Sequence, residues 1–113
     1  MVPGQAYLLK IYLAEGERYQ GLPLFEWIIR EAKHVGLAGA SVFKGVEGFG
    51  ATREIHTTRI LRLSEKLPVL IEIVDKIENI DNFIPIIEPV IGEGMVTVQK
   101  IDIRVVKIKG QEV

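Results

Sequence analysis

Apolar and polar residues alternate along several stretches of the chain, which is the pattern of β-strands that bury one face. The alternation predicts strands at 7–14, 40–47 and 68–75. A longer extended stretch follows at 95–109, and its alternation changes phase along the way. A change of phase indicates either a bulge or two successive strands.

Two other segments place their apolar residues at helical spacing. The first begins at Pro23, a residue that a first helical turn tolerates, and ends at Gly36, which suits a left-handed cap. The second opens at Asp75, which together with Glu78 resembles a capping box. Its apolar stripe continues past Pro85, where we expect a kink or a broken turn.

These elements occur in the order βαββαβ, which predicts an α+β, ferredoxin-like sandwich with two helices on one face of an antiparallel sheet. No linker, repeat or low-complexity tract divides residues 1–113, so we expect a single domain. The strands are apolar on both sides, and the side chains expected to point away from the helices are Leu8, Tyr12, Leu70 and Val74. Because an exposed apolar sheet face usually belongs to an interface, we expect a homo-oligomer in which the sheets of several subunits face one another.

Composition narrows the classes of function. Among the 113 residues, 14 Lys and Arg stand against 15 Asp and Glu, which argues against binding of nucleic acid because that needs a basic surplus. The chain has no Cys, so disulfides, thiolate nucleophiles and cysteine-based zinc sites are excluded. It also lacks a long apolar run and a basic-then-apolar N-terminus, so we expect a cytoplasmic protein that is not inserted in a membrane.

The side chains that usually carry catalysis are few and scattered. His34 falls on the exposed side of the first helix and His56 in a loop, and neither has a partner at metal-ligand spacing. Ser41 and Ser64 lack the G-x-S-x-G surroundings of a nucleophilic serine. We find no catalytic constellation and expect neither an enzyme nor a metal site.

Glycines cluster at two points where a strand meets a loop. Gly45, Gly48 and Gly50 stand at the end of the second strand, before a long polar loop. There they either bring backbone N–H groups close to a phosphate or serve a hairpin or bulge that needs positive φ. Gly92 and Gly94 leave the second helix and enter the last strand, where a plain C-cap and turn is the alternative. Spacing alone leaves these alternatives open.

Positive charge is concentrated in two segments that are distant in the sequence. Residues 51–66 carry four cations against two acids, and residues 99–110 carry four cations against one. These are either solvated faces or two basic segments that meet around a small anion. Lys107 and Lys109 lie two residues apart on the predicted last strand, where protection of a sheet edge against aggregation is the alternative role.

The order of these motifs resembles that of the PII nitrogen-regulatory signalling superfamily. The motifs are the Gly-Phe-Gly at 48–50 before a long loop, the apolar strand at 69–74, the Gly-Glu-Gly within 91–98 and the basic tail at 104–110. Taken over residues 7–109, the chain looks more closely like an uncharacterised PII-like family of similar length, a domain of unknown function.

The resemblance implies a set of site residues, because PII proteins are trimers that bind ATP or ADP in clefts between subunits. The implied nucleotide contacts are Gly48, Phe49, Gly50, Gly92 and Gly94, with cationic contacts from Arg104, Lys107 and Lys109. The loop at 51–66 is implied to be flexible and to contact a partner through Arg53, His56, Arg59 and Arg62.

Three departures from the PII pattern change what the resemblance implies. Met95 stands where PII has a lysine, so one phosphate contact is missing and a nucleotide with fewer phosphates, AMP or ADP, is favoured. Lys107 and Lys109 replace arginines and lose the bidentate fork. The loop at 51–66 contains no Tyr, so the tyrosine modification of some PII proteins has no acceptor there.

The function expected from this resemblance is that of a trimeric regulatory protein. It binds an adenine nucleotide as its ligand, uses no further cofactor, and presents its loop to a regulated membrane transporter or metabolic enzyme. The alternative is a trimeric structural module without nucleotide, like the divalent-cation-tolerance proteins. An enzyme acting on a nucleotide is the third possibility.

Overall fold

The computed structural model describes residues 1–49, 56–57 and 67–110. Four strands form the main sheet: β1 (Gly4–Ala14), β4 (Ser41–Lys44), β7 (Pro68–Asp75) and β8 (Met95–Ile103). The helices are α1 (Leu24–His34), α2 (Ile77–Ile87) and the short 3-10 helix η2 (Glu88–Val90). Two minor strand pairs complete the described part, β2 (Arg18–Tyr19) with β3 (Leu22–Pro23), and β5 (Glu47–Gly48) with β6 (His56–Thr57).

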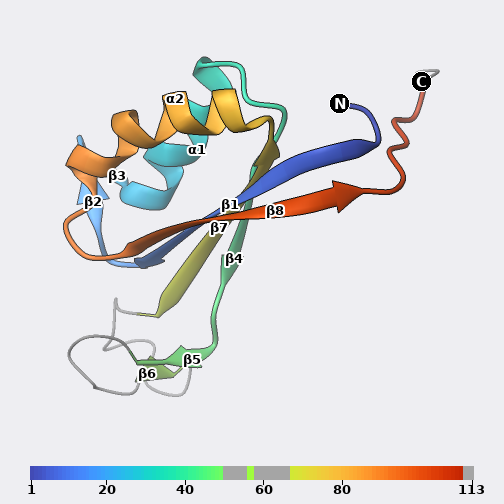
Figure 1. Cartoon of the computed structure of the whole chain (residues 1–113). Helices are drawn as coiled ribbons and strands as arrows, with labels where there is room; N and C mark the ends of the chain where they lie inside the picture. Colours follow the sequence, from blue (N-terminus) through green and yellow to red (C-terminus); the bar gives the residue numbers. More distant parts are fainter. Residues whose placement is uncertain (50–55, 58–66, 111–113) are drawn as a thin grey trace.

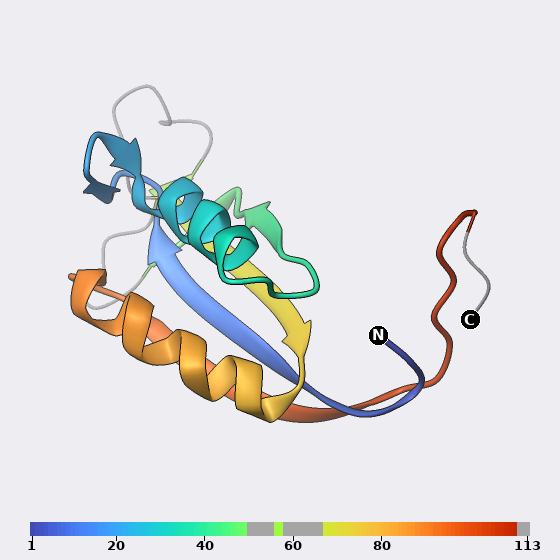
Figure 2. The ribbon, with the colours of Figure 1, turned by 90° about the horizontal axis from the view of Figure 1, so that it is seen from above.

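The main sheet has the order β4-β7-β1-β8, with every neighbouring pair antiparallel. The two helices lie side by side over one face of this sheet, and β1 and β8 run on beyond them as a two-stranded ribbon (Figures 1 and 2). The predicted α+β, ferredoxin-like sandwich is therefore confirmed. No helix within the described ranges is both long and apolar enough to cross a membrane.

The core lies between the sheet and the helices. Alternate residues of the two central strands point inward, and three residues of each helix close over them. The fully or nearly fully buried members are Leu9, Ile11, Leu13, Val69, Ile71, Ile73, Leu24, Ile28, Ala32, Ile80, Phe83 and Ile87. The strand residues that alternate with these buried ones point to the other face of the sheet, which α1 and α2 do not cover.

The open face carries a row of large apolar side chains. The strand registers place Phe43 opposite Leu70, Leu70 opposite Tyr12, and Tyr12 opposite Met95, so these four residues cross the whole sheet. Phe43 is 51% exposed and Met95 is 53% exposed. The predicted apolar second face is thus present, and no helix of the described residues covers it.

The last strand is shorter than its sequence pattern predicts. β8 ends at Ile103, and residues 104–110 form no strand, so the expectation of an extended strand through Lys109 is wrong. The reason lies in the pairing: Ile103 stands opposite Gly4, the first residue of β1, and no partner strand among the described residues continues beyond it. The apolar alternation after Ile103 therefore belongs to a tail that leaves the sheet.

The second predicted strand is also divided. Only Ser41–Lys44 pairs with β7, and Glu47–Gly48 turns away to pair with the short strand His56–Thr57. The pairing of this segment with β7 ends at Gly45, whose amide donates to the carbonyl of Pro68 (2.7 Å). The strand predicted over 40–47 is thus two short strands in different sheets.

The second helix begins and continues differently from the prediction. It runs through Pro85 to Ile87, so the broken turn expected there is wrong. Its N-cap is Lys76, which makes no side-chain capping bond, and Glu78 does not complete a capping box with Asp75. A carboxylate one residue before the cap does the stabilising instead.

Asp75 is the buried acid at this helix start and is only 4% exposed. Its carboxylate accepts from the Lys76 amide (2.7 Å), the Asn79 side-chain amide (2.8 Å) and the Ala38 amide (2.8 Å). Burial alone acts to raise the pKa of Asp75, but these hydrogen bonds together outweigh it and hold the pKa below its ordinary value. The carboxylate thereby ties α2 to the segment that leads into β4.

Candidate functional site

The glycines at the end of β4 are explained by close packing. Neither Gly45 nor Gly48 has positive φ. A Cβ on Gly45 would collide with the ring of Pro68, and one on Gly48 would lie 3.1 Å from Pro68 Cγ. These glycines therefore let the start of β7 approach the chain that follows β4. A hairpin or bulge that needs positive φ is excluded at these two positions.

Of the two glycines before β8, Gly94 is also explained by close packing. A Cβ on Gly94 would collide with the carbonyl oxygen of Tyr12, so glycine is required for β8 to join β1 there. Gly92 is freer, and its nearest neighbour would be a carboxylate oxygen of Glu17 at 3.7 Å. Both glycines are exposed, so the loop they form lies open at the end of the sheet.

A carboxylate already rests on this loop. Glu17 Oε1 accepts a hydrogen bond from the Glu93 amide (3.0 Å), while Oε2 is buried and has no hydrogen-bond partner within the described part of the chain. Burial raises the pKa of Glu17; the hydrogen bond from the Glu93 amide lowers it and the charge of Glu93 raises it further, so the balance lies above the ordinary value. Sequence analysis missed Glu17, because an acid in a loop has no periodic signal.

The backbone around Glu17 is held in place on both sides. Its amide donates to the carbonyl of Ala14 (3.3 Å), and its carbonyl accepts from the amide of Leu24, the first residue of α1 (2.7 Å). The carboxylate is thus delivered from the turn after β1, which adjoins the start of β8 because Tyr12 pairs with Met95.

The predicted cations lie at the other end of β8. Arg104 is exposed and its Nε is 3.7 Å from Asp102 Oδ2, and Lys107 and Lys109 are exposed in the tail. Nine residues of strand separate this tail from the Gly92–Gly94 loop, a span of about 30 Å at the usual strand rise. The tail leaves the molecule at the end remote from that loop (Figure 1). Within one chain, the Gly92–Gly94 loop and the two lysines are therefore not brought together.

The two glycine groups lie at the same end of the sheet but at opposite edges. Gly48 follows edge strand β4, and the Gly92–Gly94 loop precedes edge strand β8. Three strand spacings, about 14 Å, separate those edges. The groups thus flank one end of the sheet without meeting across it.

Several predicted residues lie outside the described ranges. These are Gly50, Arg53, Arg59 and Arg62, together with most of the loop predicted at 51–66. For His56 only the backbone is described, and it pairs with Gly48 in the β5–β6 pair. Phe49 is 62% exposed next to that pair.

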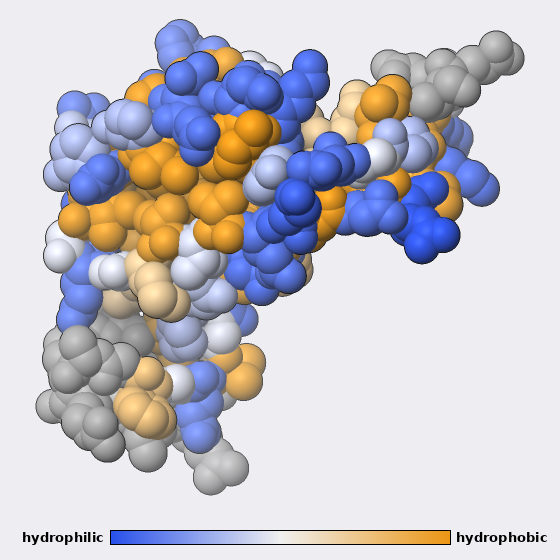
Figure 3. Space-filling model, viewed as in Figure 1, coloured by the Kyte–Doolittle hydropathy of each residue, from blue (hydrophilic) through white to orange (hydrophobic). Residues whose placement is uncertain are grey.

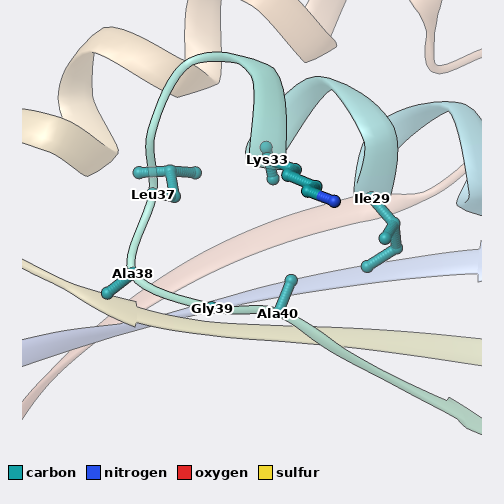
Figure 4. A pocket seen from close by; sticks show the side chains of 7 residues that line it. Ile29, Lys33, Leu37, Ala38, Gly39 and Ala40 are labelled. Atoms are coloured by element: carbon teal, nitrogen blue, oxygen red, sulfur yellow. The ribbon is translucent and has the colours of Figure 1, made fainter.

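A hollow of about 250 Å³ opens elsewhere, between α1 and the segment that leads into β4 (Figure 4). Its lining residues are Ile29, Ala32, Lys33, Leu37, Ala38, Gly39 and Ala40. It is smaller than the roughly 300–1,000 Å³ of typical ligand pockets, and none of the predicted nucleotide contacts lines it. The hollow is therefore not the site that the sequence analysis predicts.

The surface offers apolar contacts but no cluster of metal ligands within 1–49, 56–57 and 67–110. Hydrophobic side chains gather over α2 and the neighbouring part of β8 on the face seen in Figure 3. Val98 of β8 and Ile86 of α2 are among the exposed large apolar residues of these elements. Contact with another protein surface is what such apolar groups offer.

Sequence comparison places the chain among uncharacterised proteins. A family model described as "Uncharacterized ACR, COG1993" (DUF190) matches residues 6–103. A UPF0166 protein of Aquifex aeolicus (strain VF5) is 35% identical over 98 residues, which are 85% of this chain and 90% of that protein. A UPF0166 protein of Methanocaldococcus jannaschii is 40% identical over 95 residues, which are 83% of this chain and 87% of that protein.

Structure comparison finds the same fold in CPII, a nitrogen regulatory PII-like protein from Thiomonas intermedia K12. Its structure bound to ADP, AMP and bicarbonate has a TM-score of 0.63 and 16% identity, covering 88% of this chain and 96% of that one. A structure of CPII bound to ADP, AMP and acetate gives 0.59 and 16%, covering 92% and 93%. The predicted resemblance is confirmed: the fold is PII-like, and the chain belongs to the DUF190 (UPF0166) family of uncharacterised proteins.

Proposed function

We propose that the protein is a PII-like regulatory protein that binds an adenine nucleotide, AMP or ADP, in clefts between the subunits of a homotrimer. One observation carries the proposal: a single chain holds the Gly92–Gly94 loop and the Lys107 and Lys109 side chains at opposite ends of β8. A site that uses both must therefore take the loop from one subunit and the tail from its neighbour.

The open sheet face supports the assembly that such a site requires. The row of Phe43, Leu70, Tyr12 and Met95 crosses all four strands, and both of its end residues are about half exposed. Packing three such faces together buries apolar surface that water otherwise covers. The same packing gives the tail of each subunit a neighbour to contact.

The chemistry of the two pieces suits a phosphate. The loop offers backbone donors, and the tail offers two ammonium groups, each worth roughly 1.5–3 kcal/mol in a charge-assisted hydrogen bond. Met95 adds no cation next to the loop, so a long phosphate chain gains little. The fold is shared with CPII, a protein whose structures hold ADP and AMP, which supports an adenine nucleotide as the ligand.

The proposed role is regulatory. We expect no chemical change of the nucleotide and no further cofactor; binding instead alters how the segment at 51–66, with Arg53, His56, Arg59 and Arg62, meets a transporter or metabolic enzyme. An enzyme acting on the nucleotide would need a nucleophile or base beside the cleft. Within the described residues, the loop carries Glu93 and contacts the Glu17 carboxylate, and the tail carries Lys107 and Lys109, to which we assign binding.

A structural trimer without nucleotide is the second candidate, and the glycines favour it. Gly45 is required by the Pro68 ring and Gly94 by the Tyr12 carbonyl, and Gly48 lies in tight contact with Pro68, so the presence of these glycines does not need a phosphate. The two candidates differ in what Lys107 does, because a purely structural trimer has no use for an ammonium group in the cleft.

The first experiment measures nucleotide binding by calorimetry on the wild-type chain and on Lys107→Ala. The proposal expects AMP and ADP to bind, and the variant to bind about ten- to a hundredfold more weakly with little change in thermal stability. Lys33→Ala is the matched control, since Lys33 is also exposed but lies beside the hollow at α1. Equal affinities in all three proteins would contradict the proposed cleft.

A second experiment tests whether the cleft lies between subunits. Lys107→Ala is mixed in equal amounts, through unfolding and refolding, with a loop variant carrying Gly92→Asp, whose carboxylate repels a phosphate. In a cyclic assembly about one site in four joins an intact loop to a neighbour's intact tail, so about a quarter of the sites recover. A cleft within one chain would recover none.

A further inference from the structure

We propose that Glu17 is a specificity-determining residue: its carboxylate occupies the Glu93 amide of the Gly92–Gly94 loop and selects against nucleotides whose phosphate chain reaches that loop. The inference rests on the proposed function and concerns the same site. It assigns a role to an acid that the sequence analysis left unassigned in a loop.

The geometry gives Glu17 the position that a phosphate oxygen would take. Oε1 lies 3.0 Å from the Glu93 nitrogen and 3.7 Å from where a Cβ of Gly92 would be. The Glu93 backbone has a single N–H, so a phosphate that takes its full hydrogen bond has to displace the carboxylate. The Glu93 amide is therefore already hydrogen-bonded to a carboxylate of its own chain.

The second carboxylate oxygen is the unusual part of the arrangement. Oε2 is shielded from solvent, and no donor within the described residues contacts it. A carboxylate whose only task is to tether the loop would be expected to satisfy both oxygens, because an unpaired buried oxygen is costly. Burial and the charge of Glu93 also raise the pKa of Glu17, because both disfavour its ionised form.

A phosphate approaching the loop meets two obstacles from Glu17. The first is competition for the amide, and the second is repulsion between two negative groups in a partly buried place. AMP carries one phosphate and ADP and ATP carry more, so the penalty falls on whichever nucleotide extends a phosphate to Glu93. This is a second cause, besides Met95, for a preference for short phosphate chains.

The test compares Glu17→Gln with the wild-type chain, using calorimetric titration with AMP, ADP and ATP at one pH. Glutamine keeps an oxygen that accepts from the Glu93 amide but removes the negative charge. We expect the affinity of ADP or ATP relative to AMP to rise about tenfold. Glu15→Gln is the matched control, because Glu15 lies two residues away and its Oε1 pairs with Lys44 Nζ at 2.9 Å instead of with the loop.

Glu17→Ala separates selection from tethering. If Glu17 selects among nucleotides, Glu17→Ala also raises the affinity for the longer phosphate chains relative to AMP. If Glu17 only tethers the loop, Glu17→Gln changes no affinity and Glu17→Ala weakens the binding of all three nucleotides. The amide signal of Glu93 in a nitrogen–proton NMR spectrum gives a readout independent of adenine. Inorganic pyrophosphate should shift this signal more strongly in Glu17→Gln than in the wild-type chain.

The outcomes are distinguishable. Unchanged or lowered ratios of ADP and ATP to AMP in Glu17→Gln, with AMP still bound, overturn the role of Glu17 and leave the proposed function standing. Failure of the wild-type chain and every variant to bind any nucleotide overturns the proposed function and this inference together. A rise in the ratios that Glu15→Gln reproduces also overturns the inference, because it would then be an effect of net charge.

Discussion

Replacement of Phe43 by alanine should weaken the assembly far more than the fold. Phe43 ends the apolar row on the open sheet face and is 51% exposed in the single chain. An aromatic side chain has an area on the order of 200 Å², so about 100 Å² remains for a neighbour to cover. At about 25 cal/mol per Å², that cover is worth about 2.5 kcal/mol per subunit.

In a trimer this contribution counts three times, giving about 7.5 kcal/mol per assembly. The concentration at which half of the chains are assembled varies as the square root of the trimer dissociation constant. Phe43→Ala should therefore raise that concentration by up to about 500-fold. Within the single chain, the substitution at an edge strand should cost about 1 kcal/mol or less.

Analytical ultracentrifugation over a concentration series measures the midpoint of assembly, and thermal unfolding of the dilute monomer measures the cost to the fold. Val35→Ala is a suitable control, because Val35 is 43% exposed at the end of α1, away from the open sheet face. Equal midpoints for the two variants would refute the argument that the open face is the interface. So would a wild-type chain that stays monomeric at every concentration.

Three further predictions concern the fold and the loop. Gly94→Ala should lower the free energy of unfolding by about 1–3 kcal/mol, measured in urea, because its Cβ meets the rigid carbonyl of Tyr12; an unchanged midpoint would refute the close approach. The Asp75 carboxyl has a pKa held below its ordinary value of 3.8, so its contribution is present above pH 3.8 and is lost as the pH falls through the lowered value. The free energy of unfolding, measured in urea, should therefore fall below about pH 3.8 by more in the wild-type chain than in Asp75→Asn. Parallel pH profiles of the two proteins would contradict this role of Asp75. Lys44→Ala removes an exposed ion pair with Glu15 and should change the unfolding free energy by about 1 kcal/mol or less; a larger loss would show that the pair matters more than its exposure implies.

The elements of the sandwich were predictable because their signals are local. Alternation over 68–75 reproduces β7 residue for residue, and Gly36 ends the first helix with a φ of 86° as a left-handed cap. The apolar second face also follows from alternation alone, since Leu70 and Tyr12 must point opposite to their buried neighbours. Such features depend on a few adjacent residues and survive any arrangement of the rest of the chain.

The misplaced features depend on pairing between distant segments. The tail after Ile103 alternates like a strand, but it forms none because β1 begins at Gly4 and offers no further partner. Pro85 was expected to kink α2 or to break a turn, and the broken turn is wrong because the helix continues through it to Ile87. Local patterns do not contain the length of a partner strand or the packing that holds a proline inside a helix.

The candidate site was predictable only in part for the same reason. Its glycines could be found by spacing, but the packing that requires Gly45 and Gly94 involves Pro68 and Tyr12, which no local pattern connects to them. Glu17 could not be found at all, since its partner amide lies 76 residues along the chain. Only the fold reveals which end of β8 each charged group occupies.

The contact of Gly45 with Pro68 has a consequence for how this family can vary. The Gly45 amide bonds to the Pro68 carbonyl at 2.7 Å, and the Glu15 amide bonds to the Leu67 carbonyl at 2.9 Å. The chain is thus fastened to the sheet on both sides of the segment in between, and the ends of that segment meet whatever its length or sequence. Each doubling of such a closed segment costs only about 0.6 kcal/mol, so insertions and deletions there are nearly neutral for the fold. Residues 46–66 can therefore change in length and sequence while the sheet keeps the same two attachment points.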